Sequence, residues 1–214
     1  MDANPWHCPP KHFESNKFRG VDTFTVVRDP YSLMISEYYY FFSNKEDLVR
    51  KMKIKVGDLN DPDFMNEWIV NATQTAIKKG RCYYDHCIPL HKFAYSDDGK
   101  QMVTHILKME ELSDSFPKLM EQYNLPVKLE HKNSREGSTS LGVNDLSREA
   151  IAKINEWAGP DFDLFGYEKR DPSRAKNNVH GPGAYGAQDE RGLHKLEFVH
   201  VSKTDGSAIE TAGK

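Results

Sequence analysis

Several features that would place the chain in a special class are scarce or missing. Cysteine occurs only three times in 214 residues, and because three cysteines cannot all pair, we expect a reducing, cytoplasmic location. No apolar run approaches the roughly 18 residues of a membrane-spanning helix, and residues 1–5 lack the start of a signal peptide. Basic residues are not in excess, with 29 Lys and Arg against 32 Asp and Glu. We therefore expect no membrane and no nucleic-acid partner.

What is present indicates a globular protein. Aromatic residues make up 11 % of the chain, which is too many for a disordered polymer. At roughly 150 residues per domain, the length predicts a single domain over residues 1–214. A chain of this size buries a full core without disulfides or metals to hold it together.

Strand and helix patterns alternate along the first 170 residues. β-branched and aromatic runs bounded by proline or polar residues predict strands, and apolar residues recurring at helical spacing predict helices. The predicted elements are strands at 23–27 and 105–109, and helices at 30–42, from Asp61-Pro62 onward, at 113–123 and, after the N-cap Ser147, to 157. This alternation predicts an α/β domain with a mainly parallel sheet.

The composition and the apolar pattern change at residue 170 and again at residue 196. Residues 170–195 are rich in glycine and have almost no apolar periodicity, which predicts a flexible linker. Residues 196–201 then read as a strand, residues 202–207 as a small polar loop, and residues 208–214 as the start of a helix. A strand, loop and helix start at the end of the chain are not typical of a disordered tail.

The polar loop after this last predicted strand has the chemistry of a phosphate site. Lys203 supplies a positive charge, and small residues at a helix start let backbone N–H groups face an anion. The loop is not a Walker A motif, because Lys203 precedes Gly206 instead of following the second glycine. A plain turn fits the same residues. The candidate binding residues are Lys203, Thr204, Asp205, Gly206, Ser207 and Ala208.

A second candidate site lies where the first predicted strand meets its helix. Arg28 follows this strand, and ligands of open α/β sheets bind beyond the carboxyl ends of the strands. A guanidinium at this place can hold a phosphate with two hydrogen bonds, and Ser36 lies two turns into the helix. A surface pair between Arg28 and Asp29 is the alternative interpretation.

A third candidate is His7, which stands in Trp6-His7-Cys8-Pro9-Pro10. A histidine ahead of a proline-stiffened turn can serve as a general base, because imidazole titrates near neutral pH. An exposed or purely structural histidine is the alternative.

Together these segments resemble sulfotransferases that use 3′-phosphoadenosine 5′-phosphosulfate (PAPS), most closely the carbohydrate branch. Residues 202–208 resemble the family's P-K-T-G-G-T-S loop, and Trp6-His7-Cys8-Pro9 is similar to its T-H-x-P stretch. Arg28-Asp29-Pro30 with Ser36 resembles its R-D-P element, in which a serine follows the arginine by eight residues. Later landmarks of the family are similar to residues 106–112, 131–134 and 161–167.

The resemblance implies transfer of a sulfuryl group from PAPS to a hydroxyl of a carbohydrate or small-molecule acceptor, without a metal. His7 is then the general base, and Lys203 stabilises the leaving 3′-phosphoadenosine 5′-phosphate (PAP). Arg28 and Ser36 hold the 3′-phosphate. The exposed loop residues Lys132 and Arg135 are candidates for a second phosphate clamp. The implied fold is P-loop-like, a three-layer α/β/α domain with a mainly parallel sheet.

The order of these elements differs from that of the family, in which the phosphosulfate loop comes first. Here it comes last, so we expect a circular permutant in which residues 170–195 join the old C-terminus to the old first strand over residues 196–214. A unit of a tandem array, or a dimer that exchanges this strand, gives the same written order. The protein is then a monomer or a strand-exchanged dimer.

Two other functions remain open. Asp205 stands where the family has glycine and Ala208 where it has a hydroxyl, which is compatible with a catalytically inactive PAP-binding or scaffold protein. Alternatively, cysteine and histidine side chains form a zinc site, although their spacing fits no common zinc module. The candidate zinc ligands are His7, Cys8, Cys82, His86 and Cys87.

Overall fold

A computed structural model describes residues 9, 21–44, 46–51, 53, 56–82, 86–129 and 141–175. In these residues two strands are formed, β1 (Phe24–Val27) and β2 (His105–Lys108). The helices are α1 (Pro30–Asn44), α2 (Glu46–Lys51), α3 (Pro62–Lys79), α4 (His91–Ala94), α5 (Leu112–Gln122), α6 (Arg148–Trp157) and α7 (Gly159–Phe165). Short 3-10 helices are η4 (Met109–Glu111), η5 (Val143–Asp145) and η6 (Pro172–Arg174).

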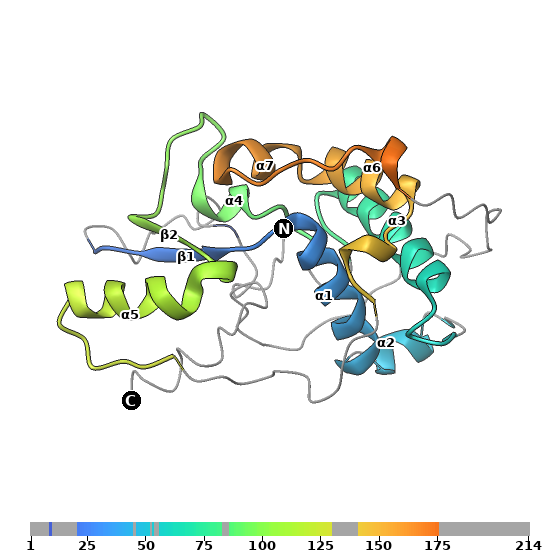
Figure 1. The fold of residues 1–214 in the computed structure, drawn as a ribbon, viewed down its shortest axis with the longest axis horizontal. Helices are drawn as coiled ribbons and strands as arrows, with labels where there is room; N and C mark the ends of the chain where they lie inside the picture. The colour runs from blue at the N-terminus through green and yellow to red at the C-terminus, as the bar shows by residue number, and fades with distance from the viewer. Residues whose placement is uncertain are drawn as a thin grey trace.

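The two strands form a parallel pair whose register ends with Val27 opposite Lys108. Side chains alternate between the two faces of a strand. Val26 and Leu107 therefore pack on α5, on one face of the pair. Val27 and Ile106 instead face the larger helical core. Figure 1 shows α5 along one side of the strands and α4 and α7 on the other, so the described part is a mixed α/β structure, mostly helical, with a small two-stranded parallel sheet.

Helix boundaries follow local sequence signals. The side chain of Asp61 accepts a hydrogen bond from the N–H of Asp63 at the start of α3, where Pro62 has no N–H that needs an acceptor. Gly80 ends that helix with a φ of 78°, a left-handed conformation that glycine adopts without strain. The predicted N-cap Ser147 is confirmed, since its side chain accepts from the N–H of Ala150 at the start of α6.

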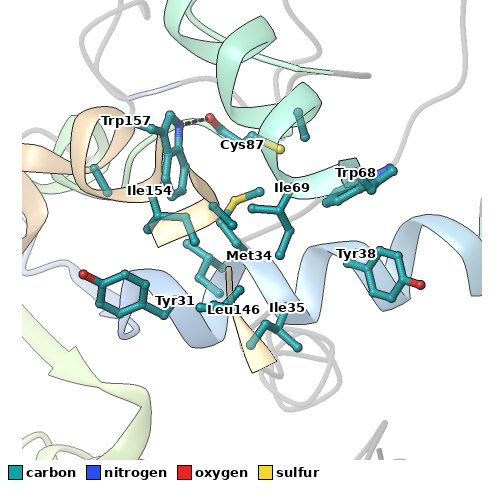
Figure 2. Packing of buried hydrophobic residues seen from close by; sticks show 14 of the residues in the cluster. Tyr31, Met34, Ile35, Tyr38, Trp68, Ile69, Cys87, Leu146, Ile154 and Trp157 are labelled. Atoms are coloured by element: carbon teal, nitrogen blue, oxygen red, sulfur yellow. Dashed lines mark hydrogen bonds between the residues drawn. The ribbon is translucent and has the colours of Figure 1, made fainter. Parts of the chain in front are cut away.

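The larger core is built where α1, α3 and α6 meet, and it is dominated by large side chains. Tyr38 of α1 is fully buried and lies 5.8 Å, centroid to centroid, from Trp68 of α3. Figure 2 shows Met34, Ile69 and Ile154 converging from the three helices. Burial of aromatic side chains of this size is a main source of stability.

Three helices were not predicted. The helix expected to end at Trp157 does so, and Gly159-Pro160 then open α7, because proline suits the first turn of a new helix. The sequence did not predict α2 or α4, which are six and four residues long. The other predicted helices and both predicted strands within residues 23–157 are present, with boundaries shifted by one or two residues.

The start of the predicted linker is held against the helices. The backbone N–H of Arg170 donates to the Tyr31 hydroxyl at 2.7 Å, and Asn155 Nδ2 donates to the Arg170 carbonyl at 3.0 Å. Residues 176–195, and the strand, loop and helix start predicted at 196–214, lie outside the described residues. Within the described ranges, no helix combines the length and apolar character needed to span a bilayer.

Cys82 and Cys87 form a disulfide, with their Cα atoms 5.5 Å apart. This pairing differs from what a reducing location, expected from the odd cysteine count, would give. An odd cysteine count shows only that one must be left over, and Cys8 lies outside the described residues.

Reducing this disulfide is expected to lower the free energy of unfolding by roughly 2 kcal/mol, the chain-entropy value for so short a loop. The measurement is denaturant unfolding with and without dithiothreitol. Cys82→Ser should be as stable as the reduced protein and insensitive to the reductant, whereas Cys8→Ser should keep the sensitivity. Identical unfolding curves for reduced and oxidised protein would contradict the structural role.

The carboxyl group of Glu67, in α3, should lower the stability of the fold at neutral pH. Its Oε1 atom is buried and has no hydrogen-bond partner among the described residues, and burial raises the pKa of this carboxyl above its usual range. A raised pKa means that the folded state favours the proton, so ionisation destabilises the fold as the pH rises from about 4.5. Glu67→Gln should therefore stabilise the protein by about 0.5 kcal/mol at pH 7, and the gain should vanish at pH 4. The exposed Glu121→Gln is the control, and a gain that persists at pH 4 would argue against the account.

Candidate functional site

The junction between β1 and α1 is fixed by its own side chains. Asp29 Oδ1 accepts hydrogen bonds from the Ser32 N–H at 2.8 Å and from the Ser32 hydroxyl at 2.9 Å. The Asp29 carbonyl accepts from the N–H of Leu33 at 2.9 Å. Asp29 thus caps the helix that begins at Pro30, and the chain turns directly from a parallel strand into a helix.

This turn places the two described candidate residues on one strand–helix unit. Arg28 is half-buried at the carboxyl end of β1, and Ser36 is half-buried on α1. Ser36 follows Ser32 by one helical turn, about 6 Å along the axis, but the Ser32 hydroxyl is already bound to Asp29. The Asp29 carboxylate therefore serves as a helix cap. The alternative interpretation, a surface pair between Arg28 and Asp29, did not include this role.

The end of β2 is tied to the same junction through Glu110. Strand β2 stops at Lys108 and turns into the 3-10 helix η4. Glu110 Oε1 accepts from the backbone N–H of Asp29 at 2.9 Å, and Glu110 Oε2 accepts from the Tyr167 hydroxyl at 2.9 Å. Lys108 Nζ lies 4.8 Å from the centre of the Tyr167 ring.

Tyr167 is held as a neutral donor in this network. Burial, together with the hydrogen bond to Glu110 and the charges of nearby carboxylates, raises the pKa of its hydroxyl far above the usual value. The phenol therefore keeps its proton at physiological pH. Sequence reasoning noted the segments 106–112 and 161–167 only as landmarks and assigned no role to Glu110 or Tyr167, because the contact between them is purely tertiary.

A buried carboxylate anchors the loop that leads into α4. Asp161 of α7 is fully buried, and its oxygens accept from the N–H groups of Leu90 and His91 at 2.8 and 2.9 Å. The same carboxylate lies 2.5 Å from His91 Nδ1. Two backbone donors and one imidazole satisfy this charge, so Asp161 fastens α4 to α7.

The three candidate zinc ligands that the structure describes have other partners. The sulfurs of Cys82 and Cys87 are joined in the disulfide, and His86 Nδ1 lies 2.9 Å from Glu37 Oε2 in a buried pair. The Tyr40 ring stacks on the His86 ring with centroids 5.5 Å apart. Across the described residues no group of three or more His, Cys, Asp or Glu side chains could hold a metal.

The remaining candidates cannot be placed relative to this junction. They lie outside the described residues, and they are His7, Lys132, Arg135, Lys203, Thr204, Asp205, Gly206, Ser207 and Ala208. No protein-family model, no curated protein and no solved structure matches the chain. The function proposed below rests on the residues and on the geometry at the ends of β1 and β2.

Proposed function

We propose that the protein is a sulfotransferase that moves a sulfuryl group from PAPS to a hydroxyl of a carbohydrate or small alcohol. The observation that carries the proposal is the position of Arg28. It follows the last residue of a parallel strand, two residues before the start of the helix that bears Ser36. Ligands of open α/β sheets bind at this end of the strands, and a guanidinium there suits a phosphate.

A second observation supports the same proposal. Three segments that resemble sulfotransferases, at 28–30, 106–112 and 161–167, meet through the two hydrogen bonds of Glu110. The residues that these two bonds join are 81 and 57 positions apart in the chain, so their meeting is not a consequence of sequence proximity. A shared site is a physical reason for three such segments to occur together.

The proposed fold is the permuted, three-layer form. Both faces of the β1–β2 pair pack against helices, which is compatible with a larger sheet between two helical layers. Residues 196–201 would add a strand to this sheet and bring Lys203 to its carboxyl end. A strand-exchanged dimer would supply the same strand from a second copy.

In the proposed mechanism, the acceptor oxygen attacks the sulfur of PAPS in line with the bridging oxygen. The new O–S bond forms as the S–O bond to the 5′-phosphate breaks, and PAP leaves. His7 takes the proton of the acceptor hydroxyl. Lys203 and the backbone N–H groups of residues 204–208 stabilise the charge on the leaving phosphate, while Arg28 and Ser36 hold the 3′-phosphate. Lys132 and Arg135 would form a second clamp.

The test is release of PAP from PAPS in the presence of monosaccharides, a disaccharide, a phenol and a small alcohol. Acceptor-dependent release that falls at least ~100-fold in Lys203→Ala, but not in the exposed control Lys118→Ala, supports the proposal. PAP binding without release for any acceptor would favour the inactive PAP-binding protein, as Asp205 and Ala208 suggest. Neither binding nor release would overturn both.

A further inference from the structure

Glu110 occupies an unusual place for an acidic residue, since it lies at the strand ends where a phosphate is proposed to bind. Its side chain is exposed, yet both carboxylate oxygens are used, one by the Asp29 N–H and one by the Tyr167 hydroxyl. A negative charge near a phosphate site weakens binding by simple repulsion. A structural benefit has to offset this repulsion if the site binds phosphate.

The benefit follows from which atoms Glu110 contacts. The parallel ladder ends with Val27 opposite Lys108, and β2 then turns away into η4. The N–H of Asp29 would be the next group to find a partner along β1, and Glu110 Oε1 supplies it at 2.9 Å. The side chain therefore continues the pairing by one step after the backbone of β2 has left.

That hydrogen bond fixes the peptide group between Arg28 and Asp29. Val27, the residue before Arg28, is held in the parallel ladder, so the backbone is fixed on both sides of the Arg28 Cα atom, and the Cα–Cβ bond of Arg28 leaves the strand in a set direction. Tyr167 holds the other carboxylate oxygen at 2.9 Å, so the carboxylate cannot rotate away without losing a second bond. Support of this kind is what keeps a binding side chain in its productive geometry.

We infer that Glu110, held by Tyr167, is a positioning residue that orients Arg28 for recognition of the 3′-phosphate of PAPS and PAP. This inference rests on the proposed function and adds to it a determinant of nucleotide specificity. It predicts the direction in which PAP affinity changes when Glu110 is removed. Repulsion alone predicts tighter PAP binding when Glu110 is removed, whereas positioning predicts weaker binding.

The experiment is calorimetric titration of the full chain with PAP and with adenosine 5′-phosphate (AMP), which lacks the 3′-phosphate. Glu110→Ala should bind PAP about five- to tenfold more weakly, the effect of one lost charge-assisted hydrogen bond, and should bind AMP unchanged. Glu110→Gln keeps an acceptor for the Asp29 N–H and should recover most of the affinity. Tyr167→Phe should lose about two- to threefold for PAP.

Glu111 provides the matched control. It is the adjacent exposed carboxylate of η4, so Glu111→Ala removes the same charge without breaking the contact to Asp29. It should leave PAP affinity unchanged or tighten it by up to about twofold. Thermal unfolding of each variant checks that the fold is intact.

The outcomes distinguish a failure of the positioning role from a failure of the proposed function. If the unmodified chain binds PAP and Glu110→Ala binds it equally well or more tightly, the positioning role is wrong and the proposed function stands. An equal loss for PAP and AMP in Glu110→Ala would also overturn it, since the effect would not depend on the 3′-phosphate. If the unmodified chain does not bind PAP at all, the proposed function itself fails.

Discussion

Arg28→Ala is expected to weaken PAP binding by at least ~100-fold, the usual loss when a preorganised charge is removed from a buried or partly buried phosphate contact. Arg28 is half-buried at the carboxyl end of β1, and the turn after it is fixed by the cap that Asp29 forms with Ser32. Because this backbone is rigid, little affinity should be recovered by rearrangement. The measurement is the Kd for PAP by calorimetry.

Two further variants separate charge from geometry at this position. Arg28→Lys keeps the positive charge but not the two-pronged hydrogen bonding, so it should lose about tenfold. Arg174→Ala removes an arginine whose side chain is 88 % exposed, and it should bind PAP like the unmodified chain. Equal affinity of Arg28→Ala and Arg174→Ala would show that Arg28 does not contact the nucleotide.

The largest loss of stability is expected at Asp161. Its side chain is fully buried and accepts from the N–H groups of Leu90 and His91 and from the His91 ring. Asp161→Ala leaves these donors without their acceptor inside the protein, which should lower the free energy of unfolding by about 3 kcal/mol. The measurement is denaturant unfolding at pH 7.

A matched control lies two residues further along the same helix. Asp163 is 76 % exposed and its pairing with Lys169 spans 3.4 Å, so Asp163→Ala should change stability by less than about 0.5 kcal/mol. Asp161→Asn keeps one acceptor oxygen and should fall between the two. A loss below 1 kcal/mol for Asp161→Ala would mean that the loop before α4 is anchored by other contacts.

The parts of the fold that could be predicted are those encoded by neighbouring residues. Asp61-Pro62 and Ser147 are helix starts that local chemistry defines, and the strand–helix unit around Arg28 is visible as an apolar run followed by proline. The short helices α4 and α7 were missed because their stability comes from Asp161, a contact across 70 residues. The disulfide between Cys82 and Cys87 spans only five residues, but an odd cysteine count does not indicate which two cysteines pair.

The candidate site also contains residues whose placement local sequence predicts and residues whose placement it does not. Arg28 and Ser36 belong to one continuous segment, so their joint placement on β1 and α1 follows from local structure. Glu110 and Tyr167 contact this junction only through tertiary packing. The residues next to them in the sequence do not indicate that contact. The proposed proximity of Arg28 and Lys203 stays a prediction, because Lys203 lies outside the described residues.

The most direct test of a PAPS-dependent function is a calorimetric comparison of PAP and AMP on the unmodified 214-residue chain. The two ligands differ by the 3′-phosphate that Arg28 and Ser36 are proposed to hold. The account predicts that PAP binds at least ~100-fold more tightly than AMP, because the 3′-phosphate gains a charged contact in a preorganised site. Equal affinities, or no binding of PAP at millimolar concentration, would contradict a PAPS-dependent function for this protein.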